Sequence, residues 1–177
     1  MNSMKKFWLI GLVALALPAT AAALTSSDYK NASKYCKAVR ADVGTTTFRA
    51  TYGTNKHKSN AFGKCVSGQA RVEHANHSNA VSDCRDERAE DTAAFNEKYG
   101  TGRNGSNALG KCVSQKSKAA SDDQEEATVK AAKACRTERS EDAAAFKAKY
   151  GTNRNKSNAF GKCVSKTAKE LSEQTEA

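Results

Sequence analysis

The sequence predicts an all-α fold: three small, disulfide-stapled helical modules in tandem, joined by exposed helical linkers into an elongated molecule. Three observations predict it. A unit that begins and ends with cysteine occurs three times, each copy carries helix-capping residues at matching positions, and the six cysteines fall two to a copy. Repetition of this kind indicates one supersecondary unit used several times.

The three copies align along their whole length. The copy that starts at Cys135 reads CRTERSEDAAAFKAKYGTNRNKSNAFGKC, and the copy at Cys84 reads CRDERAEDTAAFNEKYGTGRNGSNALGKC. The copy at Cys36, CKAVRADVGTTTFRATYGTNKHKSNAFGKC, has one extra residue. The chain therefore divides into a signal peptide (1–23), module 1 (24–68), a linker (69–82), module 2 (83–115), a linker (116–128), and module 3 with a C-terminal tail (129–177).

The N-terminus has the layout of a secretory signal peptide. Lys5 and Lys6 precede an apolar run from Phe7 to Leu17, and a small-residue stretch follows, with cleavage expected after Ala21 or Ala23. An apolar run of about eleven residues is too short to span a membrane but typical of a cleaved signal. We therefore expect a secreted protein in an extracytoplasmic, oxidising compartment.

The mature protein expected from this cleavage is basic. Without residues 1–23 it holds 27 Lys and Arg residues against 19 Asp and Glu residues, a net charge of +8. Residues 24–82 hold 9 of these cations and only 3 of the acids, so the positive excess lies toward the N-terminal end. Such a charge balance favours electrostatic attraction to anionic partners.

The cysteines predict one disulfide within each module. Zinc is the competing interpretation, but the chain has no Cys-x-x-Cys pair. Each module offers about four large apolar side chains, a core too small to hold the fold without a cross-link. Six cysteines allow fifteen pairings, and the repeat selects one, because each copy must solve the same stability problem by itself. The predicted pairs are Cys36–Cys65, Cys84–Cys112 and Cys135–Cys163.

Each module is predicted to contain three helical pieces. Asp91 and Asp142 stand where an N-cap would begin the short second helix. Phe and Tyr four residues apart share one face of that helix. The glycine after each of these tyrosines is expected to take a left-handed C′ conformation, and a serine to cap the third helix. These glycines are Gly53, Gly100 and Gly151, and these serines are Ser59, Ser106 and Ser157.

The linkers lack large apolar residues apart from single valines, and we expect them to be exposed and helical, with a break or a bend. Gly68 stands directly before the first linker, between Cys65 and Cys84. The run Ser121-Asp122-Asp123-Gln124 in the second resembles a capping box, which predicts a new helix start. The modules would then form a string of beads.

Cations in the loops and at the start of each third helix are the candidate anion-binding residues. No aromatic side chains alternate with them, which argues against specific nucleic-acid recognition. A recurrent arginine (Arg40, Arg88, Arg139) is instead interpreted as local structure, with Arg139 paired to Asp142. The candidate anion-binding residues are Lys56, Lys58, Lys64, Arg103, Lys111, Arg154, Lys156 and Lys162.

Catalysis, metals and cofactors are not expected. Glu87 and Glu138 recur at one position, but a carboxylate pair for glycoside cleavage needs a cleft that raises one pKa. His74 and His77 could share a helical face, yet no third metal ligand is in view, so we interpret them as solvated. The sequence thus predicts a non-enzymatic protein without a cofactor.

The string from Tyr150 to Val164, YGTNRNKSNAFGKCV, resembles small secreted cysteine-paired repeat proteins of high-GC Gram-positive bacteria. The resemblance covers each module and neither linker. It implies an exported, bacterial, cysteine-paired class of protein and brings no activity with it.

The function expected from these observations is binding of an anionic cell-envelope polymer, or another polyanion, through basic modules. The alternative is a small secreted effector, either a hydrolase inhibitor or a membrane-active protein. Salt-sensitive binding of a polyanion tests the first, because exposed charges are screened at moderate ionic strength. A protease panel and a liposome-leakage assay test the second.

Overall fold

The structure, a computed structural model, describes residues 23–102 and 104–175. The predicted signal peptide, 1–23, lies outside the described residues except for Ala23, and Arg103 lies outside them as well. Seven α-helices and no strand make up the described part of the chain, so the all-α class is confirmed. The helices are α1 (Ser26–Val43), α2 (Thr45–Tyr52), α3 (Ala61–Glu90), α4 (Thr92–Tyr99), α5 (Ala108–Glu141), α6 (Ala143–Tyr150) and α7 (Ala159–Thr175).

The three predicted disulfides are confirmed. Each joins the long helix before a short helix to the long helix after it, so a module consists of a helix end, a short helix, a polar loop and the start of the next helix. In each short helix the phenylalanine and tyrosine rings pack with centroids 4.8 or 4.9 Å apart. The bridges are Cys36–Cys65, Cys84–Cys112 and Cys135–Cys163.

Helices α3 and α5 each pass through two modules without interruption, so the predicted break in the linkers is wrong. Gly68 lies inside α3 with open space around it, and Ser121 lies inside α5. The Ser121 hydroxyl donates to Glu73 Oε2 at 2.8 Å instead of capping a new helix. A tertiary partner on α3 therefore overrides the local capping signal.

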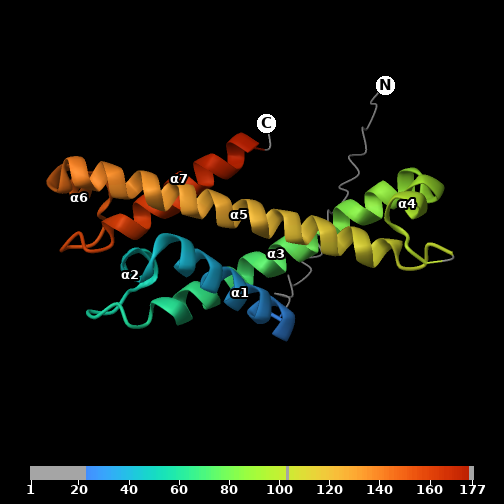
Figure 1. Cartoon of the computed structure of the whole chain (residues 1–177), viewed down its shortest axis with the longest axis horizontal. Helices are drawn as coiled ribbons and strands as arrows, with labels where there is room; N and C mark the ends of the chain where they lie inside the picture. Colours follow the sequence, from blue (N-terminus) through green and yellow to red (C-terminus); the bar gives the residue numbers. More distant parts are fainter. Residues whose placement is uncertain (1–22, 103, 176–177) are drawn as a thin grey trace, which may run out of the picture.

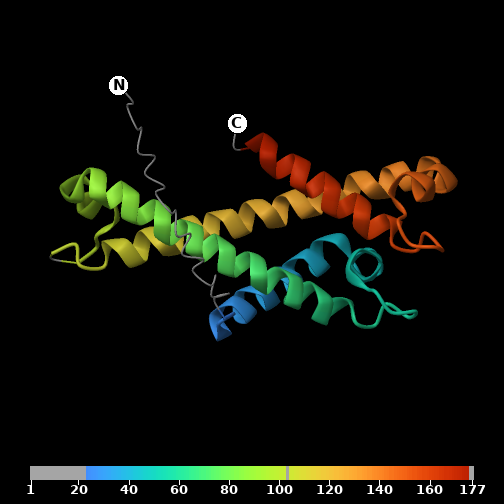
Figure 2. The same ribbon diagram turned by 180° about the vertical axis from the view of Figure 1, so that it is seen from behind.

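The linkers are also more buried than predicted. Figure 1 shows α3 and α5 running antiparallel and crossing each other, and Figure 2 shows the same crossing from behind. The linkers pack against each other and against α1, and one face of each is buried as a result. The buried linker residues are Gln69, Ala70, Glu73, Ala80, Ala127 and Thr128.

Modules 1 and 3 share one hydrophobic core at one end of the molecule, and module 2 has its own core at the other end (Figure 1). Phe48 of α2 and Phe146 of α6 belong to the same cluster, whereas Phe95 of α4 belongs to the smaller one. The molecule is elongated as predicted. The string of beads is wrong, because the antiparallel α3 and α5 return module 3 to module 1.

The shared core explains why module 1 departs from the repeat. Val39 occupies the position that Glu87 and Glu138 hold in the other copies, and it is 1% exposed. Those two glutamates keep 27% and 35% of their side-chain surface exposed and bind Lys98 and Lys149. A glutamate in place of Val39 would be buried among apolar groups, so module 1 carries valine there.

The cap predictions are partly confirmed. Asp91 accepts hydrogen bonds from the N–H groups of Ala93 and Ala94 at 2.9 Å, and Asp142 does the same in α6. The left-handed conformation predicted for Gly53, Gly100 and Gly151 is wrong, since their φ angles are −71°, −77° and −75°. These helices end in extended backbone.

Close packing, and not φ, requires glycine at these helix ends. A Cβ on Gly53 would lie 2.6 Å from Lys58 Cβ and 2.7 Å from the Arg49 carbonyl oxygen. A Cβ on Gly151 would lie 2.6 Å from the Lys147 carbonyl oxygen. The chain turns so tightly at this point that no side chain fits.

Three glycines occupy equivalent positions in the first turns of α3, α5 and α7. Replacing them with alanine should raise the unfolding free energy at two of these positions and lower it at the third. A Cβ on Gly63 or Gly110 meets nothing within 4 Å, whereas a Cβ on Gly161 would lie 2.5 Å from the Thr51 carbonyl oxygen of α2. We expect Gly63→Ala and Gly110→Ala to stabilise by about 0.5–1 kcal/mol, the usual helix preference for alanine over glycine. Gly161→Ala should destabilise by about 1–3 kcal/mol through overpacking. Urea unfolding of the three variants measures this, and equal effects would contradict the described packing of α7 on α2.

The bridge of module 2 should protect that module alone. The chain-entropy model assigns about 3–4 kcal/mol to closing a loop of this size, and the separate core of module 2 has few other contacts to replace it. In Cys84→Ser/Cys112→Ser, amide hydrogen exchange should become fast in α4 while α1 and α7 stay protected. The matched variant Cys36→Ser/Cys65→Ser should lower protection in modules 1 and 3 together, because they share a core. Loss of protection confined to module 1 in that variant would contradict the shared core.

Candidate functional site

The polar loop of each module is held closed by one asparagine. Asn60 Oδ1 accepts the N–H of Thr54 at 3.0 Å, and its Nδ2 donates to Thr54 Oγ1 at 2.7 Å. Asn107 and Asn158 make the same contacts in the other copies. Asn60 and Asn107 also occupy the N-cap positions of α3 and α5, so the prediction that Ser59 and Ser106 cap these helices is wrong by one residue.

Two of the predicted anion-binding lysines close the loops. Lys58 and Lys156 adopt positive φ angles of 56° and 54°, and Gly105 holds the same place in module 2 with φ 61°. Lys58 Nζ donates to the Gly53 carbonyl at 2.8 Å, and Lys156 Nζ donates to the Gly151 carbonyl at 2.8 Å. The alternation of lysine and glycine at this repeat position is a sequence signal for left-handed backbone that our sequence analysis did not use.

The other described candidates are exposed: Lys56, Lys64, Lys111, Arg154 and Lys162. Among the described residues, no carboxylate lies within ion-pair distance of any of them. Arg103, the remaining candidate, lies outside the described residues.

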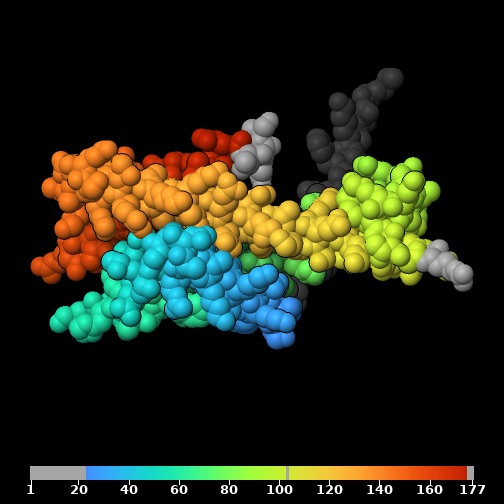
Figure 3. Space-filling model, viewed as in Figure 1, coloured from blue at the N-terminus to red at the C-terminus, as the bar shows by residue number. Residues whose placement is uncertain are grey.

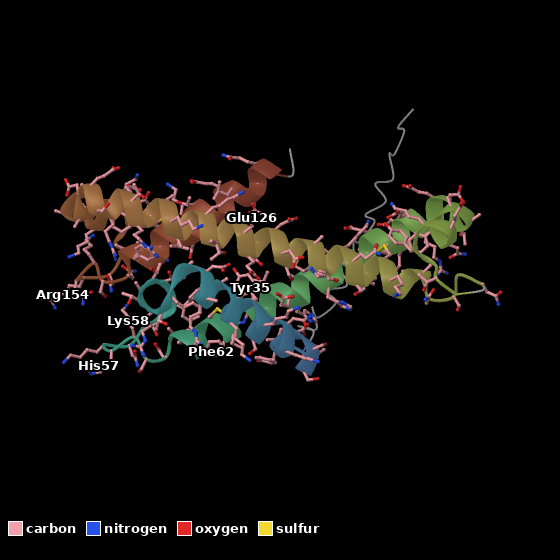
Figure 4. All side chains as sticks on the ribbon, viewed as in Figure 1. Tyr35, His57, Lys58, Phe62, Glu126 and Arg154 are labelled. Atoms are coloured by element: carbon pink, nitrogen blue, oxygen red, sulfur yellow. A yellow bond between two sulfur atoms is a disulfide. The ribbon has the colours of Figure 1, made fainter. Side chains whose placement is uncertain are left out.

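The fold brings two of the three loops together. Figure 4 shows His57, Lys58 and Arg154 at the same end of the molecule, on loops from modules 1 and 3. We call residues 53–60 and 151–158 the loop end. Lys111 of module 2 lies near the opposite end, at the start of α5. Among the described candidates, the loop cations of modules 1 and 3 therefore lie at one end of the molecule, whereas Lys111 lies near the other.

The loop end carries positive charge alone. Its two segments read GTNKHKSN and GTNRNKSN, which hold four cations and one histidine and no carboxylate. Other lysines are committed elsewhere: Lys98 and Lys116 bind Glu87 at 2.7 and 3.1 Å, and Lys149 binds Glu138 at 2.7 Å. The loop end is thus a place where exposed positive charge has no neutralising partner on the same segments.

Two of the three recurrent arginines, Arg40 and Arg139, pack against an aromatic ring of their own module, which is a different partner from the predicted one. The Arg139 guanidinium lies 4.8 Å from the ring centroid of Phe160, and the Arg40 guanidinium lies 5.7 Å from that of Phe62. These are cation–π contacts. The ion pair predicted between Arg139 and Asp142 is not among the salt bridges of the described residues, because Asp142 caps α6 instead.

A groove of about 810 Å³, which the sequence did not predict, lies between α1, α3 and α5. Both histidines of the linker line it, and His74 Nδ1 lies 3.2 Å from Asp28 Oδ2. Burial acts to raise the pKa of Asp28. The hydrogen bonds donated by the Thr25 N–H and hydroxyl, together with His74, outweigh it, so this pKa lies below its usual value. The signal for this groove in the sequence is a run of small side chains along one face of α5: Gly110, Ser114, Ser117 and Ser121.

Within residues 23–102 and 104–175, no three histidine, cysteine, aspartate or glutamate side chains come together as a metal site. Nor does the described part contain a helix both long and apolar enough to cross a membrane. Comparison with known protein families, curated proteins and solved structures gives no match. The resemblance to exported repeat proteins stays an expectation from the sequence.

The ion pair at Glu87 should make stability depend on pH in the acid range. Hydrogen bonds from Lys98 first, and then from Lys116, lower the pKa of Glu87 from 4.5 to about 2. Because the folded-state pKa is the lower one, this stabilisation is complete above about pH 4.5 and is lost as the pH falls toward 2. Glu87→Gln should therefore flatten the dependence of the unfolding free energy on pH between these values. Asp86→Asn, which changes the same charge next to it, serves as the control, and equal flattening in both variants would contradict a role for this pair.

Proposed function

We propose that the protein is a secreted, non-enzymatic binding protein that holds an anionic polymer or surface through its loop end. The observation that carries the proposal is the pairing of two acid-free basic loops at one end of an elongated molecule. Lys56 and Arg154 are exposed there and unpaired by any carboxylate of their loops.

The rigid mounting of the loops supports binding by both at once. Gly161 of α7 packs directly against the Thr51 backbone of α2, so the helices that flank the two loops are in contact. Asn60 and Asn158 fix the conformation within each loop. A ligand that engages one loop meets the second at high effective concentration, because little freedom remains to be lost.

The predicted export supports an extracellular role. The charged and apolar N-terminal pattern is typical of a secretory signal, and the three disulfides are compatible with an oxidising compartment. Anionic polymers and surfaces are common partners of basic proteins, since attraction needs only complementary charge.

The carboxylates that the sequence singled out favour binding over catalysis. Hydrogen bonds from Lys98 and then Lys116 hold the pKa of Glu87 near 2, and a hydrogen bond from Lys149 lowers that of Glu138. A general acid working near neutral pH needs a raised pKa. Both glutamates are instead ionised partners in structural ion pairs.

Heparin affinity at low and moderate salt tests the proposal. Binding should weaken steeply as salt rises, because added salt screens the charges and reduces the free energy gained when counterions leave the polymer. Lys56→Gln/Arg154→Gln should weaken low-salt binding by roughly ten-fold. The control Lys111→Gln/Arg88→Gln removes the same charge at the module 2 end and should weaken it about two-fold or less. Equal losses of affinity in the two variants would show that binding depends on the net charge and not on the loop end. Salt-insensitive binding would also contradict the proposal.

A further inference from the structure

The groove between α1, α3 and α5 is large enough for a small organic molecule. Its volume of about 810 Å³ falls in the range of ligand sites between packed helices. In Figure 3, α3 is recessed between α1 and the N-terminal half of α5. The groove lies away from the loop end, near the middle of the molecule, so it is a separate surface.

Buried negative charge distinguishes this groove from the rest of the molecule. Asp28 and Glu73 are 6% and 5% exposed, and they are the only charged side chains that are buried within the described residues. Both line the groove. The protein as a whole is basic, so two buried carboxylates in the same groove make this groove locally acidic.

The two carboxylates differ in their partners. Asp28 accepts from Thr25 and lies beside His74, which can carry positive charge. Glu73 accepts only from neutral groups: Gln69 Nε2 at 3.0 Å and Ser121 Oγ at 2.8 Å. No cationic group of the described residues lies within ion-pair distance of Glu73, although a buried carboxylate is costly without a counter-charge.

Glu125 is a third carboxylate that adds to the negative potential of the groove. Glu125 on α5 lines the groove next to Asp122. Burial first, and then the charges of Asp42 and Asp122, raise the pKa of Glu125, and this outweighs the opposite influence of Lys34 and Lys118. The cations that line the groove, Lys34, Arg85 and Lys118, are exposed at its rim, and Lys118 is already paired with Asp122.

The other end of the groove is apolar. Val81 of α3 and Leu109 and Val113 of α5 form its walls, and Gly110 leaves open space between them. Val113 and Ser121 are eight residues apart on one helix, which separates them by roughly 12 Å along its axis. A ligand that reaches both ends needs a charged head, a short spacer and an apolar group.

We propose that this groove binds amphipathic organic amines, with the ammonium group at Glu73 and Ser121 and the apolar group against Val81, Leu109 and Val113. The ammonium supplies the counter-charge that Glu73 lacks. Tyr35 also lines the groove, with its hydroxyl hydrogen-bonded to Thr128 at 2.8 Å.

Fluorescence titration of the oxidised protein with dansylcadaverine tests the proposal. This probe carries a primary amine, a five-carbon spacer and a naphthalene ring whose emission shifts to the blue in an apolar site. The dansyl derivative of 6-aminohexanoic acid is the matched probe with a carboxylate in place of the amine. We expect dansylcadaverine to bind at least ten-fold more tightly. Equal binding of the two probes, or no binding of the amine, would overturn the proposal.

Two variants locate the site. Glu73→Gln should weaken dansylcadaverine binding about ten-fold or more, while Glu90→Gln, an exposed glutamate at the end of the same helix, leaves it unchanged. A Cβ at Gly110 meets nothing within 4 Å, so Gly110→Leu directs a larger side chain into the groove and should abolish binding even if Glu73→Gln fails to fold. Gly63→Leu makes the same change at the equivalent position of module 1 and should bind normally. Normal binding by Gly110→Leu would place the probe elsewhere.

Because the loop end is untouched in all four variants, heparin affinity should not change in any of them, which separates this test from that of the proposed function.

Discussion

The close antiparallel packing of α3 against α5 determines the architecture of this protein. Both helices are continuous across two modules, and each buries one face made of short side chains such as Ala70 and Ala127. This packing places module 3 beside module 1, and the two fuse their small cores into one. The loop end and the groove both follow from it, since neither exists within a single module.

The disulfides hold each module together, whereas the packing of the long helices arranges the modules relative to one another. Each bridge holds a short helix and its loop onto the long helices, where about two aromatic rings would be too small a core. The long helices then decide how the stapled units meet. Module 2 shows how small the core of a single module is, because its hydrophobic cluster receives no side chains from modules 1 and 3.

Local features were predictable from the sequence. The disulfide pairs follow from the repeat, and Asp91 and Asp142 cap their helices as predicted, because these interactions lie within one module. Features that depend on distant partners were not. Ser121 looked like a helix start but binds Glu73, which is 48 residues away. The sequence alone also does not explain why Val39 stands where the other copies have glutamate, whereas the shared core does, because a glutamate there would be buried.

The candidate sites divide in the same way. Lys56 and Arg154 were identified from exposure and charge, but their common location depends on module 3 folding back past module 2. The groove takes one face from each of three helices, and the run of small residues on α5 marks only one of those faces, so the sequence alone does not predict it. A lone Glu73 in a polar linker gives no sign of burial; only the packing of α3 against α1 and α5 removes it from water.

The position of the bridges relative to the loops has a consequence for survival outside a cell. Exposed polar loops are the usual sites of proteolytic cleavage, and every loop here lies between the two cysteines of its own module. A protease that cuts between residues 54 and 59 leaves both new ends attached through Cys36 and Cys65. Within the described residues, the segments outside these bridged stretches are almost entirely helical, and regular helix is a poor protease substrate. Nicked molecules therefore stay in one piece.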